Sequence, residues 1–293
     1  MKLKVILSVL AAVILTGCAA NQSTPDSTFP TNVIPTQAES VPADTEPAPD
    51  IESIPPYETS PIFESVPAPI LDKTLKITPG HHMLSFTDPE THTKMKYWLF
   101  VPDHPTEDMP LIVYLHGMGQ IDKIHELERV GPIPSIDSIY ANDFPFLLLY
   151  PNTPVRSWTA DPIPDTLKSL IDHVVDTHYV DSDRIIITGH SMGAVGTWHM
   201  LSQYGNFFSA AVPISCPNDG TLNYDNLAEV PIRAFVGNGG EIERTYGKGM
   251  DRIVYNTNLS GGDALLTILY QCDHTNTPIA TYTKEMFEWM LEQ

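Results

Sequence analysis

The chain has 293 residues, with 36 acidic against 16 basic side chains and a formal net charge of −20. A surface this acidic repels the phosphate backbone, so nucleic acid is excluded as a partner. The charge indicates solubility rather than a mechanism, and the function has to come from local motifs.

The N-terminus is organised as an export signal. Lys2 and Lys4 form a positive segment, and residues 5–15 are almost wholly apolar but too short to span a bilayer comfortably. The segment ends in LTGC, which resembles the lipobox of bacterial lipoproteins, and the resemblance implies lipidation of Cys18. We therefore expect residues 1–18 to be a lipoprotein signal peptide, with the mature chain exported and lipid-anchored to a membrane of the bacterial cell envelope. The alternative is an ordinary signal peptide with a chance cysteine.

Residues 19–72 differ in composition from the rest of the chain. They hold eleven of the 27 prolines, nine acidic residues and no Lys or Arg. Such a segment buries too little apolar surface to offset the entropy of ordering. It is expected to be a disordered, acidic tether rich in Pro, Ser and Thr, and residues 73–293 to form one catalytic domain.

Strand patterns then follow in chain order. HHMLSFTD (81–88) and KMKYWLFVP (94–102) alternate apolar and polar residues and predict an antiparallel hairpin. Six later runs are short and almost continuously apolar, which is typical of parallel strands buried on both faces. They are PLIVYLHG (110–117), FPFLLLYPN (144–152), DRIIITGH (183–190), FSAAVPIS (208–215), PIRAFVGN (231–238) and ALLTILYQ (264–271).

Helical patterns separate these strands. Residues 163–180 place apolar side chains at helical spacing, residues 191–205 follow a strand directly, and residues 279–293 end the chain. Strands that alternate with helices predict an α/β fold with helices on both faces of a mostly parallel sheet. About eight strands with an antiparallel start fit the α/β-hydrolase fold.

The motif GHSMG (189–193) lies between a predicted strand and a predicted helix, the context of a nucleophile elbow. Sites in open α/β sheets form beyond the carboxyl ends of the strands. Ser191 is therefore predicted to be a nucleophile, with the backbone N–H of Met192 as one oxyanion donor at a helix N-terminus. The loop HGMG after the third strand offers Met118 as the second donor, and His116 is expected to hold this loop rather than take protons.

A serine hydroxyl needs a base to take its proton. His274, in the segment CDH after the last strand, is the predicted base, because the other histidines lie on the hairpin, on helices or in loops less suitably placed. His190 precedes the nucleophile and is expected to pack under the elbow. The acid should follow the strand IRAFV, where the segment reads GNGGEIER. Glu241 is the preferred acid and Glu243 the alternate.

These segments together resemble secreted α/β-hydrolases of the esterase and prolyl-oligopeptidase-like groups, including feruloyl-esterase-, acetylxylan-esterase- and polyhydroxybutyrate-depolymerase-like proteins. The resemblance rests on PLIVYLHGMG, YVDSDRIIITGHSMGAVGTW, FSAAVPIS and the C-terminal DHTNTPIATYTKEMFEWMLEQ. It implies a serine hydrolase that uses Ser191, His274 and the amides of Met118 and Met192. Relatives usually carry Asp at the position of Gly240, so the departure there puts the acid in doubt.

The substrate is less clearly indicated. Only CPNDGTLNYDNLAEV (216–230) separates two strands where interfacial lipases often insert a lid, so an open cleft and an accessible acyl ester, such as an acylated polysaccharide, are expected. Trp158 could stack on a sugar or aryl ring, or merely pack its loop down. A peptidase of the same fold, a thioesterase and a non-catalytic surface-anchored binding lipoprotein are the rival interpretations.

Two further expectations concern cysteines and metals. Cys216 and Cys272 could pair in an oxidising compartment, although the strands they follow are not expected to be adjacent. No C-x-x-C, H-E-x-x-H or calcium-loop pattern occurs, so neither a metal nor another cofactor is expected.

Overall fold

The structure is a computed structural model that describes residues 78–178, 180–216 and 221–293. The predicted signal peptide, the lipidation site Cys18 and the predicted tether lie outside the described residues. Among the helices of the described part, none is both long enough and apolar enough to cross a membrane.

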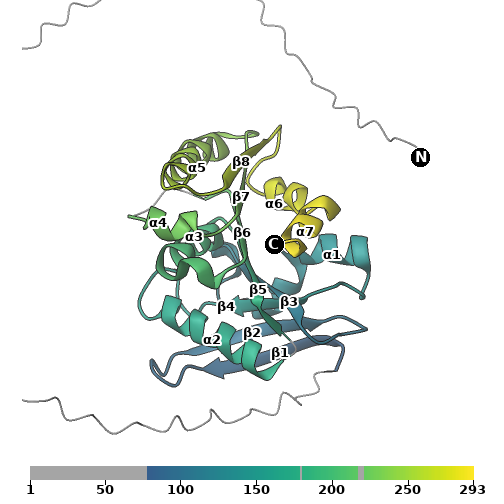
Figure 1. The fold of residues 1–293 in the computed structure, drawn as a ribbon. Helices are drawn as coiled ribbons and strands as arrows, with labels where there is room; N and C mark the ends of the chain where they lie inside the picture. Colours follow the sequence, from purple (N-terminus) through teal and green to yellow (C-terminus); the bar gives the residue numbers. More distant parts are fainter. Residues whose placement is uncertain (1–77, 179, 217–220) are drawn as a thin grey trace, which may run out of the picture. The chain divides into compact units, whose positions relative to one another are not determined.

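An eight-stranded sheet runs through the described residues in the order β1-β2-β4-β3-β5-β6-β7-β8 (Figure 1). The first three strands in this order pair antiparallel, and all later neighbours pair parallel. The strands are β1 (Gly80–Thr87), β2 (Lys94–Val101), β3 (Met109–Leu115), β4 (Leu147–Asn152), β5 (Val180–His190), β6 (Ala210–Ile214), β7 (Ile232–Gly237) and β8 (Ala264–Leu269). The predicted hairpin and the mostly parallel sheet are confirmed.

Helices cover both faces of the sheet (Figure 1). One face carries α2 (Ile163–Thr177), α3 (Met192–Tyr204), α4 (Tyr224–Ala228) and α5 (Glu241–Leu259). The other carries α1 (Ile133–Tyr140), α6 (Asn276–Thr281) and α7 (Lys284–Leu291). Short 3-10 helices, η1 (Met118–Gln120), η2 (Ile124–Arg129) and η3 (Gly205–Phe207), lie in the connections.

The hydrophobic core is divided by the sheet into two clusters, and β3 shows how. Leu111 and Val113 pack with α2 and α3, whereas Ile112 and Tyr114 pack with α1 and α7 on the opposite face. All seven residues of β3 are buried, which explains why its sequence is apolar without alternation. Each fully buried aliphatic side chain contributes about 1.5–3 kcal/mol of transfer free energy to folding.

The connection 215–231 between β6 and β7 contains the five-residue helix α4. This segment is too short for an inserted lid domain, as the sequence predicted. The carboxyl ends of the parallel strands are consequently not covered from this connection by a separate domain.

Among the described residues, two histidines have buried side chains, His116 and His178. At the end of β3, His116 donates from Nδ1 to the carbonyl of Gly117 at 2.7 Å, and its Nε2 accepts from Asn152 at 3.1 Å and from the Thr153 N–H at 3.3 Å. This bonding confirms that His116 holds the loop. His178 closes α2, with Nδ1 3.0 Å from the carbonyl of Val174. Burial lowers the pKa of both side chains from 6.5 to about 4.

We expect these two histidines to make folding less stable in mild acid. The unfolded chain takes up protons as the pH falls through 6.5, whereas the folded chain does so only near pH 4. Stability is therefore full above pH 6.5 and declines toward pH 4, by roughly 1–2 kcal/mol per histidine between pH 7 and 5. Urea unfolding of the wild type and of His178→Gln at both pH values measures this, because the variant lacks one titrating group but keeps all other charges. A variant whose stability falls as steeply as that of the wild type would contradict the expectation.

Candidate active site

Ser191 occupies a sharp turn between β5 and α3. Its backbone has φ 58° and ψ −118°, a region that non-glycine residues rarely adopt, and its N–H donates to the carbonyl of Ile214 at 2.9 Å. A Cβ on Gly193 would lie 1.8 Å from the Leu115 carbonyl oxygen, and one on Gly189 would lie 2.5 Å from the backbone of Gly193. The two glycines therefore permit the elbow, and the Ser191 hydroxyl is not used as a helix cap.

Each of the two predicted oxyanion donors is the first residue of a helical segment. Met192 is the first residue of α3 and Met118 the first of η1. Within the described part of the chain, neither backbone N–H has a hydrogen-bond acceptor. A Cβ built on Gly117 would lie 3.6 Å from Cβ of Ser191, so the HGMG loop lies directly against the elbow. The geometry fits the predicted pair of donors.

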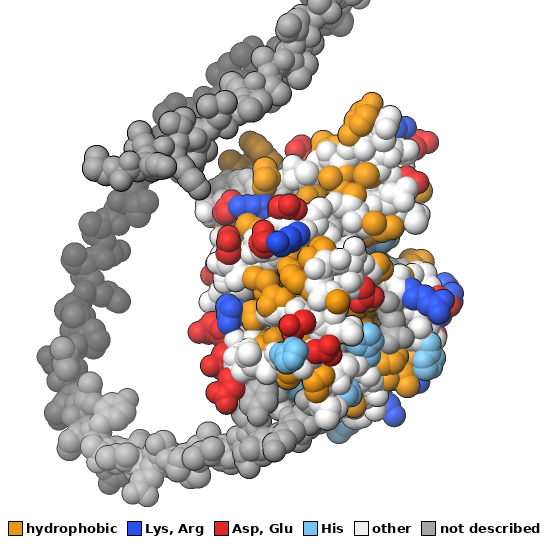
Figure 2. Space-filling view, turned by 90° about the vertical axis from the view of Figure 1, so that its right-hand side faces the viewer, with side chains coloured by type: hydrophobic (Ala, Val, Ile, Leu, Met, Phe, Trp, Pro, Cys, Tyr) orange, Lys and Arg blue, Asp and Glu red, His pale blue; other side chains and the backbone are white. Residues whose placement is uncertain are grey.

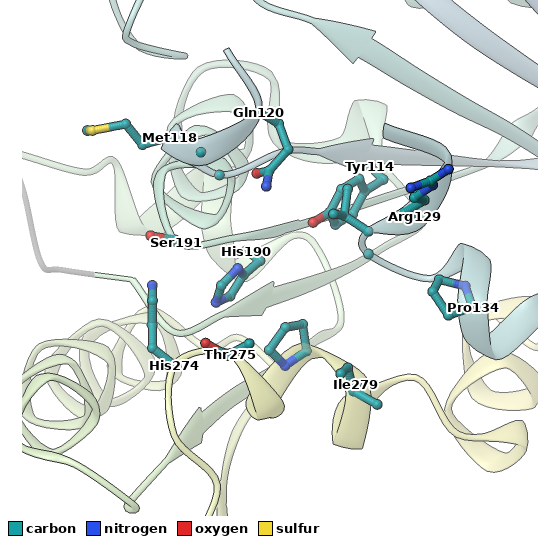
Figure 3. Close-up of a pocket in the computed structure, with 15 residues that line it drawn as sticks. Tyr114, Met118, Gln120, Arg129, Pro134, His190, Ser191, His274, Thr275 and Ile279 are labelled. Carbon is teal, nitrogen blue, oxygen red and sulfur yellow. The ribbon is translucent and has the colours of Figure 1, made fainter. Parts of the chain in front are cut away.

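The imidazole of His274 is oriented by a buried carboxylate. Its Nδ1 lies 2.7 Å from Oε1 of Glu243, whose side chain is 1% exposed. With Nδ1 donating to Glu243, Nε2 is the nitrogen available to accept the Ser191 proton. Figure 3 shows a ring nitrogen of His274 pointing toward Ser191.

The preferred assignment of Glu241 as the acid is wrong, because the partner of His274 is the alternate, Glu243. Glu241 is exposed at the first position of α5. Two residues along a helix face nearly opposite directions, so only one of the two glutamates can face the sheet. Glu243 shares the buried side of α5 with Met250, Ile253 and Thr257. This helical stripe is the sequence signal that would have favoured it.

The second carboxylate oxygen of Glu243 has three donors. Oε2 accepts from the N–H of Gly237 at 2.6 Å, from the hydroxyl of Ser215 at 2.6 Å and from that of Thr277 at 3.2 Å. Burial acts to raise the pKa of Glu243, but the hydrogen bonds from His274, Ser215 and Gly237 outweigh it and leave the pKa below its ordinary value. Glu243 is therefore held as an anion. The sequence analysis missed Ser215 and Thr277, which no motif marks.

His190 lies closer to the predicted catalytic residues than expected. Its ring centroid is 4.5 Å from that of His274, and it lines the same pocket as Ser191. Burial, followed by the proximity of His274, lowers its pKa from 6.5 to about 4. A neutral His190 does not repel the imidazolium that forms on His274 during acyl transfer.

The pocket that contains Ser191 and His274 has a volume of about 470 Å³. Of the two interpretations of Trp158, packing within the fold is confirmed and stacking on substrate is contradicted, because its side chain is 1% exposed and does not line this pocket. Instead, Trp158 donates from Nε1 to the carbonyl of His116 at 2.9 Å and packs against Gly196 of α3. It holds the HGMG loop in place.

Within the described residues, Cys216 and Cys272 are not joined by a disulfide.

Comparison with known proteins finds similarity to a peptidase family and to esterases. Residues 155–241 match the prolyl oligopeptidase family. The chain is 30% identical over 136 residues to feruloyl esterase B of Thermothelomyces thermophilus, a match that covers 42% of this chain and 44% of that protein. It is 27% identical over 124 residues to the bifunctional acetylxylan esterase/xylanase XynS20E of Neocallimastix patriciarum, covering 41% of this chain and 18% of that protein.

Solved structures show the same fold. A thermostable esterase superposes with a TM-score of 0.62 and 27% sequence identity, and the match covers 73% of this chain and 63% of that one. The curated relatives are matched over less than half of their own length. The chain has the α/β-hydrolase fold, and it is similar to esterases both in sequence, to feruloyl esterase B, and in structure.

Proposed function

We propose that this protein hydrolyses accessible carboxylic esters through an acyl-enzyme intermediate on Ser191. The observation that carries the proposal is the 2.7 Å contact between Nδ1 of His274 and the buried carboxylate of Glu243, at a pocket that His274 shares with Ser191. A carboxylate in this position fixes the imidazole tautomer needed to activate a serine.

The reaction proceeds in two steps. Ser191 Oγ attacks the ester carbonyl while Nε2 of His274 takes its proton, and the N–H groups of Met118 and Met192 stabilise the oxyanion. The C–O bond to the alcohol then breaks, and His274 returns the proton to the leaving oxygen. In the second step His274 takes a proton from water, the hydroxide attacks the acyl-enzyme, and the acid is released as Ser191 recovers its proton.

The substrate class that we propose is an acyl ester on a polysaccharide. The names of the relatives, feruloyl esterase and acetylxylan esterase, support this class, and so does the absence of a lid domain in the connection 215–231. A serine peptidase activity is the second candidate, because the matched family is that of the prolyl oligopeptidases.

Product release from defined substrates separates these two activities. We expect the full chain to release acetate from acetylated xylan or ferulate from feruloylated arabinoxylan, and Ser191→Ala to release neither. Internally quenched peptides containing proline serve as the comparison set. Cleavage of those peptides with no ester hydrolysis would replace the esterase assignment by the peptidase. If none of these substrates is cleaved and Ser191 does not react with a fluorophosphonate, the non-catalytic binding lipoprotein becomes the better description.

We also propose that the protein acts outside the cytoplasm, anchored in the bacterial cell envelope by lipid on Cys18. The support is the N-terminal sequence, in which LTGC follows a short apolar run after Lys2 and Lys4. A Cys18→Ser chain that still incorporates a tagged fatty acid in a lipoprotein-processing bacterium would contradict the anchor.

A further inference from the structure

The charge of the pocket is opposite to that of the chain. Acidic residues outnumber basic ones 36 to 16 in the sequence, and acidic side chains are spread over the face shown in Figure 2. Nevertheless, no Asp or Glu is among the described residues that line the pocket, and Arg129 is the only Lys or Arg among them. Among the described residues, the lining of the active-site pocket therefore includes a cationic side chain and no carboxylate.

Arg129 is the last residue of η2, and the surrounding loop is held by the core. The side chains of Ile124 and Leu127 are buried, Trp98 donates to the carbonyl of Ile124 at 2.7 Å, and Tyr150 donates to that of Val130 at 3.0 Å. By contrast, the guanidinium makes no ion pair with a carboxylate of the described residues. Its backbone is fixed by packing, while its side chain is exposed.

Neutral polar groups lie between Arg129 and the nucleophile. In Figure 3, Ser191 and His274 lie at one end of the pocket and Arg129 at the other, with the Tyr114 hydroxyl and the Gln120 amide between them. The Tyr114 ring is buried, and burial raises the pKa of its hydroxyl, so it remains a neutral hydrogen-bond donor. The part of the pocket away from Ser191 therefore has one cationic group, Arg129, beside the apolar side chains of Pro134 and Ile279, which suits an anionic group on an apolar body.

We propose that Arg129 binds a carboxylate of the substrate, and that the preferred substrates are esters with a carboxylate within one pocket length of the scissile carbonyl. The inference rests on the proposed esterase function and narrows its substrate class. A guanidinium pairs with a carboxylate through two parallel hydrogen bonds, and such a group occurs on the uronic acids of acidic polysaccharides. The carboxylate belongs either to the alcohol part or to the acyl part of the ester, and each gives a separate arm of the test.

Two matched substrate pairs test the proposal with the full chain. For the alcohol arm, 3-acetoxybenzoate is compared with 3-acetoxybenzamide. For the acyl arm, the mono-4-nitrophenyl ester of adipic acid is compared with the 4-nitrophenyl ester of adipamic acid, in which a primary amide replaces the free carboxylate. Within each pair an uncharged primary amide of similar shape replaces the carboxylate, so a change in the ratio of kcat/KM for the anionic and neutral members on substitution of Arg129 reports its contact with the carboxylate.

Arg129→Gln is expected to lower this ratio by about fivefold to tenfold in at least one arm, since a partly solvated charged pair is screened. Arg129→Lys should retain part of the ratio. Added salt should lower the ratio in the wild type more than in Arg129→Gln.

Arg156 is the matched control, because it is exposed and does not line the pocket, and Arg156→Gln removes the same charge from the chain. Ratios that are equal in the wild type and Arg129→Gln in both arms would overturn the proposal.

A binding experiment separates failure of this inference from failure of the esterase assignment. Calorimetric titration of 3-acetoxybenzoate and of mono-4-nitrophenyl adipate into Ser191→Ala, with and without Arg129→Gln, measures recognition of each anion without turnover. Weaker binding of either anion with Arg129→Gln supports the inference even if no ester is hydrolysed. Equal affinity of the two chains for both anions, or no binding of either anion, overturns it, whereas hydrolysis of the neutral esters by the wild type would still support the esterase assignment.

Discussion

Replacing Glu243 by Gln is expected to lower kcat/KM for 4-nitrophenyl acetate by roughly 10³–10⁴-fold, whereas Glu241→Gln changes it by less than about threefold. The Glu243 carboxylate accepts the Nδ1 proton of His274 at 2.7 Å and fixes the tautomer that leaves Nε2 as the base. A glutamine amide also presents N–H groups where Gly237 and Ser215 donate. Glu241 is exposed at the start of α5 and makes no contact with His274.

The comparison needs a control for folding, because Glu243 is buried. Circular dichroism and thermal unfolding of each variant show whether the chain remains folded. Ser215→Ala provides a milder change, since it removes one donor to Oε2 but leaves the bond between His274 and Oε1 in place. We expect Ser215→Ala to retain most of the activity. A folded Glu243→Gln chain with near wild-type kcat/KM would exclude Glu243 as the acid, and loss of activity in Glu241→Gln would restore the original preference.

Ser191→Ala is expected to reduce ester hydrolysis by roughly 10⁴–10⁶-fold, leaving only the contribution of the oxyanion donors and substrate binding. Alanine keeps the Cβ that the elbow already accommodates and removes only the hydroxyl, which does not cap α3. The variant should therefore fold normally. Initial rates with 4-nitrophenyl acetate measure the loss, and Ser209→Ala is a matched control because Ser209 does not line the pocket. Residual activity of more than a few per cent in purified Ser191→Ala would point to a different nucleophile.

The fold was largely predictable because its determinants are local. The alternation in residues 81–88 and 94–102 predicted the hairpin, and the continuous apolar runs predicted buried parallel strands. The elbow was predictable for the same reason, since strand, GHSMG and helix are contiguous in the sequence. His274 was predictable as the base because it lies just after β8, the last strand in the chain.

The remaining features depend on where helices begin and on contacts between distant segments. Whether Glu241 or Glu243 faces His274 depends on the phase of α5, which is set by its start after Gly240. Trp158 is buried because Gly196, on another element, leaves room for it. Ser215 reaches Glu243 only because β6 and β7 are neighbours in the sheet. The apolar stripe of α5 carries a local signal for Glu243, but no local pattern contains the contacts of Trp158 and Ser215.

The most direct test of the account is covalent labelling of the full chain by a fluorophosphonate, with the modified residue located by peptide mass spectrometry. We expect one adduct per chain on Ser191, no adduct in Ser191→Ala, and labelling of Glu243→Gln that is slower than that of Glu241→Gln. Such a result would mean that His274 and Glu243 activate Ser191. A wild-type chain that remains unlabelled, or that is labelled on another residue, would contradict the assignment of Ser191 as the nucleophile.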